Sequence, residues 1–139
     1  MGYFACSLEE EATHNKVVED YARFQFPEKE YDVRLNLGDA KNHALDGMYP
    51  DIIARHRATG AVCVAEVKTE TFISPAAAEQ QWAPFSRVAD EFHLVVPSGL
   101  VHRVRSLCLG IAVDRLVAYY SEPDLVEFRV ITQQPAVAS

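Results

Sequence analysis

The stretch YPDIIARHRATGAVCVAEVK, residues 49–68, decides the fold of this chain. It contains two apolar, β-branched runs, which favour β-strands, on either side of the polar segment Arg-Ala-Thr-Gly at residues 57–60. This order predicts a β-hairpin with a tight loop. A loop centred between Ala58 and Thr59 places Asp51 directly opposite Glu66. The second run has apolar side chains on both faces, so we expect its strand to lie in the centre of a sheet.

The predicted register gathers three charged side chains on one face of the hairpin. Opposed residues of antiparallel strands have Cβ atoms about 5 Å apart, which brings Asp51 close to Glu66. Lys68 shares this face because it follows Glu66 by two residues on the same strand. Two like charges opposite each other are destabilising unless a cation lies between them. The hairpin therefore predicts a divalent metal ion bound by Asp51 and Glu66.

Pro50-Asp51 followed by Glu66-Val67-Lys68 resembles the PD-(D/E)xK signature of the restriction-endonuclease-like nuclease superfamily. This superfamily includes restriction enzymes, archaeal Holliday-junction resolvases and many repair nucleases. By itself an ExK triplet most often marks a solvated ion pair at a strand end; here both halves of the motif fall on predicted strands in hairpin order. The resemblance covers the pattern of residues 9–97 and identifies no subfamily. It implies an α/β fold with a restriction-endonuclease-like core (α-β-β-β-α-β), in which helices flank a central mixed sheet.

The resemblance also implies hydrolysis of a phosphodiester bond, in DNA. Carboxylate oxygens suit Mg²⁺ or Mn²⁺, and the backbone carbonyl of Val67 points sideways from the strand to complete the ligand set of Asp51 and Glu66. The metal ion would polarise the scissile phosphate and supply the attacking hydroxide. Lys68 would orient or deprotonate the attacking water.

The remaining segments predict the other elements of this core. Ser7, followed three residues later by Glu10, matches a capping box and predicts the start of a helix. Apolar periodicity and turn residues then predict, in chain order, a helix at residues 8–24, a strand at 31–36, a helix at 76–89 that opens with Ser74-Pro75, a strand at 91–97, a helix at 100–109 and strands at 112–120 and 126–132.

Two residues of the first helix are candidate accessory site residues. Glu11 and His14 project toward the side of the helix marked by Val17 and Val18. In the resembled family this helix often supplies an additional acidic residue, a place that Glu11 or His14 could fill. The alternative is that the acidic residues 9–11 stabilise the positive end of the helix dipole and that His14 is a packing residue.

A glutamine in the helix at residues 76–89 is a further candidate. Gln81 lies at the border of the buried stripe of this helix. In resolvase-like relatives a glutamine at this place approaches the catalytic site. Gln80 is the competing assignment, and a solvent-facing amide is the alternative for either residue.

Composition is consistent with one domain at residues 1–134, followed by a disordered tail at 135–139. Of the 139 residues 49% are hydrophobic and 24% charged, which is ordinary for a globular protein. No apolar run approaches the ~20 residues of a membrane span, and no signal peptide is visible. The cysteines are three in number and widely spaced, which predicts reduced thiols in a cytoplasmic protein and neither a disulfide nor a zinc site.

The formal net charge of −7 argues against a simple nucleic-acid binder. Arg55, Arg57 and Arg87 are the residues that we expect to contact DNA, and homodimerisation is one way to concentrate so few positive charges. The acidic balance also supports an alternative, a non-catalytic DNA-binding or assembly subunit on the same fold. A third hypothesis is a metal-independent α/β domain in which the motif is accidental.

Overall fold

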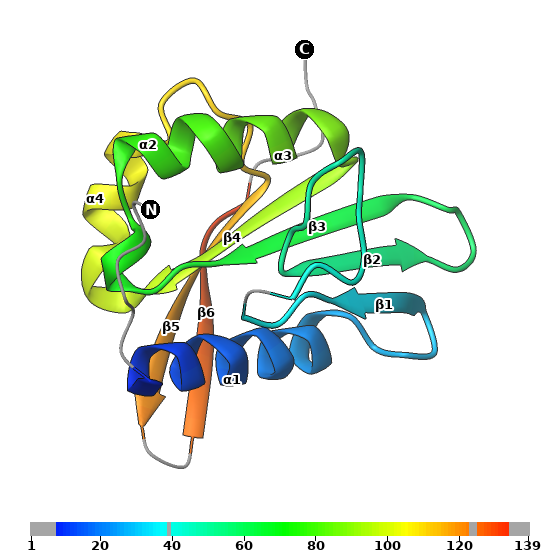
Figure 1. The fold of residues 1–139 in the computed structure, drawn as a ribbon, viewed down its shortest axis with the longest axis horizontal. Helices are drawn as coiled ribbons and strands as arrows, with labels where there is room; N and C mark the ends of the chain where they lie inside the picture. The colour runs from blue at the N-terminus through cyan, green and yellow to red at the C-terminus, as the bar shows by residue number, and fades with distance from the viewer. Residues whose placement is uncertain (1–7, 39, 123–124, 134–139) are drawn as a thin grey trace.

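The computed structural model describes residues 8–38, 40–122 and 125–133. These residues form an α/β fold around one six-stranded mixed β-sheet, in which the strands lie side by side in sequence order (Figure 1). The strands are β1 (Tyr31–Leu35), β2 (Ile52–His56), β3 (Val62–Val67), β4 (Glu91–Pro97), β5 (Arg115–Glu122) and β6 (Leu125–Gln133). The pairs β1–β2, β2–β3 and β5–β6 are antiparallel, whereas β3–β4 and β4–β5 are parallel.

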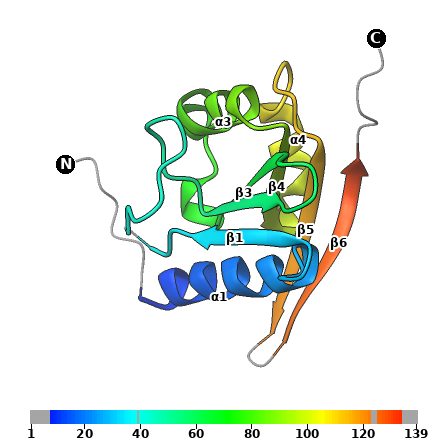
Figure 2. The ribbon, with the colours of Figure 1, turned by 90° about the vertical axis from the view of Figure 1, so that its right-hand side faces the viewer.

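Helices cover both faces of the sheet (Figure 2). One face is covered by α1 (Leu8–Gln25), which buries Val17, Val18 and Tyr21 against the sheet. The other face is covered by α2 (Pro75–Ala77), η2 (Ala78–Trp82), α3 (Ala83–Val88) and α4 (Val101–Leu107). Single-turn 3-10 helices, η1 (Glu70–Phe72) and η3 (Ser98–Leu100), follow β3 and β4.

Each side of the sheet has its own apolar core because side chains alternate along the central strands. On β4, Val95 packs on the α1 side, while Leu94 and Val96 pack on the opposite side with Trp82. β3 is central, as predicted, with residues of both cores fully buried along it.

The first predicted helix and most predicted strands agree with the observed elements, and three segments differ. The helix predicted at residues 76–89 is broken by a π-helical segment, η2, in which the N–H of Ala83 bonds the carbonyl of Ala78. Pro84 follows directly and has no N–H to donate, so the regular bond pattern could not continue through this turn.

The helix predicted at residues 100–109 ends at Leu107, and the strand predicted at 112–120 starts only at Arg115. Between them a tight turn follows Gly110, whose φ is 84°, and Asp114 accepts a hydrogen bond from the backbone N–H of Phe92 at 2.8 Å.

The predicted cap Ser7 and tail 135–139 lie outside the described residues. In the described part of the chain, no helix has the length and apolarity needed to cross a membrane.

Candidate active site

The β2–β3 hairpin has the predicted register. Ile52 pairs with Ala65, so the adjoining residues Asp51 and Glu66 occupy the next opposed positions. The backbone N–H of Asp51 donates to Oε1 of Glu66 at 2.9 Å, and the backbone N–H of Val67 donates to Oδ2 of Asp51 at 2.8 Å. Each carboxylate is thus held by the backbone of the opposite strand, which fixes the pair in position.

The three charged groups of the hairpin are almost completely buried. Asp51, Glu66 and Lys68 are 8%, 5% and 8% exposed. Nζ of Lys68 lies 3.2 Å from Oε2 of Glu66. Burial raises the pKa of Glu66 to about 7, the charge of Asp51 adds to this effect, and the ammonium of Lys68 opposes it. Lys68 therefore compensates only part of the negative charge, and a further cation would stabilise the ionised pair.

His14 is the residue of α1 that contacts the carboxylate pair. Its Nε2 lies 3.1 Å from Oδ2 of Asp51, and its Nδ1 lies 3.1 Å from Oδ1 of Asn15. Burial by itself would lower the pKa of His14, but the hydrogen bond and charge of Asp51 outweigh it and raise the pKa to about 9. At neutral pH His14 is therefore a cationic partner of Asp51. To ligate a metal ion, its ring would first have to lose a proton.

A cavity of about 260 Å³ lies over these groups. It is lined by residues from α1, the loop before β2, the hairpin and the segments that follow β3: Glu11, His14, Gly38, Tyr49, Asp51, Glu66, Val67, Lys68, Thr69, Phe72 and Gln81. The cavity thus brings together all the metal, catalytic and accessory residues singled out from the sequence.

Gln81, and not Gln80, lies at this cavity. Gln80 is exposed, while Oε1 of Gln81 is buried and has no hydrogen-bond partner within the described residues. Buried amide oxygens are nearly always paired. A water molecule or ligand bound in the cavity is the natural partner for this oxygen.

The loop before the hairpin is held by a residue that the sequence analysis did not single out. Asn36 is buried, and its Nδ2 donates to the carbonyls of His43 and Pro50, both at 2.8 Å. Its Oδ1 accepts from the backbone N–H groups of Asn42 and His43. These bonds hold the chain on the path that leads into Asp51. The predicted strand alternation marked Asn36 only as a polar position at a strand end.

The arginines expected to contact DNA do not line the cavity. Arg55 and Arg57 are exposed at the turn end of the hairpin, away from Asp51, where they donate to the carbonyls of Gly60 and Glu28. Arg87 is exposed on α3. A different cation, Lys41, lies at the rim, with its Nζ 5.7 Å from the ring centroid of the cavity residue Tyr49.

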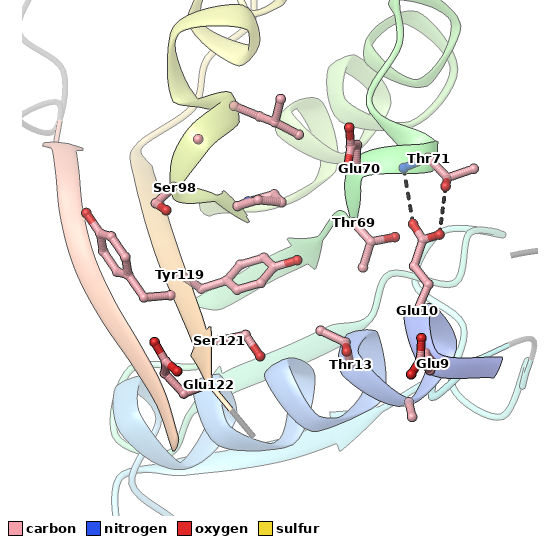
Figure 3. A pocket seen from close by; sticks show the side chains of 15 residues that line it. Glu9, Glu10, Thr13, Thr69, Glu70, Thr71, Ser98, Tyr119, Ser121 and Glu122 are labelled. Atoms are coloured by element: carbon pink, nitrogen blue, oxygen red, sulfur yellow. Dashed lines mark hydrogen bonds between the residues drawn. The ribbon is translucent and has the colours of Figure 1, made fainter. Parts of the chain in front are cut away.

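A larger groove of about 990 Å³ adjoins the cavity, and Thr69 lines both (Figure 3). The Glu10 carboxylate accepts bonds from the backbone N–H and hydroxyl of Thr71 at 3.1 and 2.7 Å, shown as dashed lines in Figure 3. The lining also contains three other carboxylates, those of Glu9, Glu70 and Glu122. Carboxylates repel phosphate groups, and this groove is therefore a poor path for a nucleic-acid backbone.

A second group of possible metal ligands lies at the other end of β3. The donor atoms of Cys63, Glu91 and His93 lie within 4.8 Å of one another. Glu91 and His93 are already hydrogen-bonded to each other, and the Tyr21 hydroxyl lies 2.8 Å from Nδ1 of His93. Burial raises the pKa of the Cys63 thiol, with Glu91 adding to the shift, so the thiolate that a metal would need is disfavoured. Cys63 and Cys108 are free thiols.

The charge balance also differs between the two ends of β3. The hydrogen bond to His93, with smaller help from the charges of His93 and Arg115, lowers the pKa of Glu91, whereas the pKa of Glu66 is raised. The carboxylate pair of the hairpin is therefore the less compensated of the two groups, although Lys68 and His14 each lie beside one of its acids. In comparisons with known proteins, no family model, no curated protein and no solved structure matches this chain.

Proposed function

We propose that this chain is a metal-dependent nuclease that binds Mg²⁺ or Mn²⁺ through Asp51 and Glu66 and hydrolyses phosphodiester bonds in DNA. The observation that carries the proposal is the buried pair of opposed carboxylates beside Lys68. Burial and Asp51 raise the pKa of Glu66 to about 7, so a divalent cation at this place would stabilise both ionised acids. Carboxylate oxygens are the donors that Mg²⁺ and Mn²⁺ prefer.

The backbone geometry supports Val67 as a third ligand. In an extended strand the N–H and C=O of one residue point to the same side. The N–H of Val67 bonds Oδ2 of Asp51, so its carbonyl is expected to point toward the same carboxylate. When bound, the metal ion would polarise the scissile phosphate and lower the pKa of a bound water.

The other cavity residues have roles that follow from their positions. Lys68 adjoins Glu66 and would orient the attacking water and stabilise the charge that develops on the phosphate. The unpaired Oε1 of Gln81 would accept a hydrogen bond from that water. His14 would hold Asp51 in place through its hydrogen bond.

The arrangement of elements supports a restriction-endonuclease-like core. Residues 8–97 run through α1, β1, β2, β3, the interrupted helix of α2, η2 and α3, and then β4, which is the α-β-β-β-α-β order implied by the motif. The mixed sheet places the motif residues where β2 begins and β3 ends.

A second candidate is a non-catalytic DNA-binding or assembly subunit on the same fold. The net charge of −7 and the acidic groove beside the cavity favour the assembly role in particular, because both weaken the attraction for a phosphate backbone that an independent nuclease needs.

Plasmid nicking in the presence of Mg²⁺ or Mn²⁺, combined with calorimetric metal titration, tests both candidates. The nuclease binds the metal and nicks, and Asp51→Asn abolishes both, while Glu79→Gln, which removes the charge of an exposed carboxylate on η2, affects neither. Metal binding without nicking would favour the non-catalytic subunit. Absence of metal binding would overturn the proposed centre.

A further inference from the structure

The last strand of the sheet is an open edge. Within the described residues, β6 hydrogen-bonds only to β5, and in Figure 2 it runs along the border of the sheet. A bulge in its pairing with β5 lies at Ile131, and the segment 125–130 before it contains no proline or lysine. Natural proteins usually protect an edge of this length with such residues, because its free N–H and C=O groups are a template for another strand.

Exposed apolar side chains gather along this edge. Leu125 and Val130 on β6 are 52% and 41% exposed, and Tyr120, which faces Glu127 from β5, is 39% exposed. Phe24 on α1 is 57% exposed, and its ring centroid lies 5.3 Å from that of Phe128. These side chains lie on both faces of the sheet beside the open edge, where a further strand would cover part of them.

The sequence of the edge is complementary to itself. Residues 125–131 read Leu-Val-Glu-Phe-Arg-Val-Ile, which is symmetric about Phe128 in residue character. Two antiparallel copies centred on Phe128 would place Glu127 of each opposite Arg129 of the partner subunit. The same register pairs valine with valine at positions 126 and 130.

The faces of the strand agree with this register. Phe128 and Val130 pair with Tyr119 and Val117, both in the core on the α1 side. Arg129 and Glu127 pair with Ala118 and Tyr120 and so lie on the opposite face, where the Arg129 guanidinium is 5.7 Å from the Tyr120 ring centroid. A twofold axis perpendicular to the sheet would extend both faces without exchanging them.

Neighbouring antiparallel registers are disfavoured by charge. Centring the pair on residue 127 would place Glu127 opposite its own copy, and centring it on 129 would do the same for Arg129. Like charges directly opposite each other destabilise a strand pair.

We propose that two copies of this chain join their sheets through β6, antiparallel and centred on Phe128, to form a homodimer with one continuous sheet. This inference does not depend on the nuclease assignment.

Charge exchange at the edge tests the proposal by sedimentation equilibrium. The parent chain should be a dimer at micromolar concentration. Glu127→Arg and Arg129→Glu should each place like charges opposite each other twice and weaken dimerisation at least about tenfold. An equimolar mixture of the two variants should form a heterodimer, because every opposed pair then has opposite signs. The doubly exchanged chain E127R/R129E should form a homodimer again.

Arg87→Glu is the matched control, since it makes the same charge change on α3 and should leave the dimer intact. Circular dichroism of each variant verifies folding, which these exposed positions should not disturb. A monomeric parent chain overturns the dimer. A parent dimer that is indifferent to both single changes, or variants whose mixture stays monomeric, overturns the proposed β6 pairing.

Discussion

The backbone N–H of Asp51 bonds the Glu66 carboxylate at 2.9 Å, so the second acid of the motif is held by the main chain of the first. Side chains held by backbone groups keep their positions when a neighbouring side chain is changed. The contributions of Lys68, Gln81 and His14 can therefore be separated by substitution without dispersing the two carboxylates.

Lys68→Ala should separate catalysis from metal binding. Lys68 lies 3.2 Å from Glu66 and would repel a metal ion bound there, so its loss should leave Mn²⁺ affinity unchanged or raise it. Nicking should fall by ~10²–10⁴-fold, the usual contribution of general acid–base help. Calorimetry and a plasmid assay on one preparation measure both quantities. If Lys68→Ala binds the metal and nicks at the parental rate, Lys68 is only the partner of an ion pair.

The two neighbouring glutamines provide a matched pair of substitutions. Gln81→Ala removes an unpaired buried oxygen at the cavity, and we expect the nicking rate to fall by about tenfold or more if that oxygen positions the attacking water. Gln80→Ala changes an exposed side chain on the same helical turn and should behave as the parent. Equal rates for the parent and both variants would remove Gln81 from the site.

The metal-free protein should lose stability as the pH rises. The pKa values of Glu66 and His14 are raised in the folded chain, from 4.5 to about 7 and from 6.5 to about 9. Folding therefore favours their protonated forms. The contribution of Glu66 is fully present below pH 4.5 and lost through pH 7, and that of His14 is present below pH 6.5 and lost through pH 9.

Urea unfolding in a chelating buffer measures this loss. Between pH 6 and 9 the free energy of unfolding should fall on the order of 4 kcal/mol, because one pKa unit corresponds to about 1.4 kcal/mol. His14→Gln should flatten the part of the curve above pH 7. A stability that is constant or rises over this range would contradict the charge distribution described for the site.

DNA contact should depend on Lys41 more than on the hairpin arginines. Lys41 lies beside Tyr49 at the cavity rim, whereas Arg55 is at the turn end of the hairpin. Lys41→Ala should weaken DNA binding and reduce the slope of log affinity against log salt by ~0.9, the value for one lost phosphate contact. Arg55→Ala is the control. A larger effect for Arg55→Ala would restore the expectation drawn from the sequence.

The hairpin register could be predicted because it depends on local features, namely the position of one tight turn and the lengths of two β-branched runs. The separation of Arg55 from Asp51 follows from equally local geometry. A strand rises about 3.3 Å per residue, so four residues place the arginine about 13 Å from the acid.

The parts of the site that escaped prediction depend on contacts between distant segments. Asn36 bonds residues 6 to 14 positions away in the loop before the hairpin. His14 reaches Asp51 only because α1 packs across the sheet. Helical periodicity showed which side of α1 faces the sheet, but it could not show which residue of another element lies opposite His14.

The central position of β3 has a consequence for motion. It is hydrogen-bonded to β2 on one side and β4 on the other, and Cys63 to Val67 are all buried. Amides of such a strand exchange with solvent only when the whole domain unfolds, whereas amides of loops exchange through local opening. We therefore expect the amide of Glu66 to be among the slowest to exchange. Adjustment of the cavity to a substrate is therefore expected from its other walls, namely the loop at residues 40–50, the start of α1, η1 and η2.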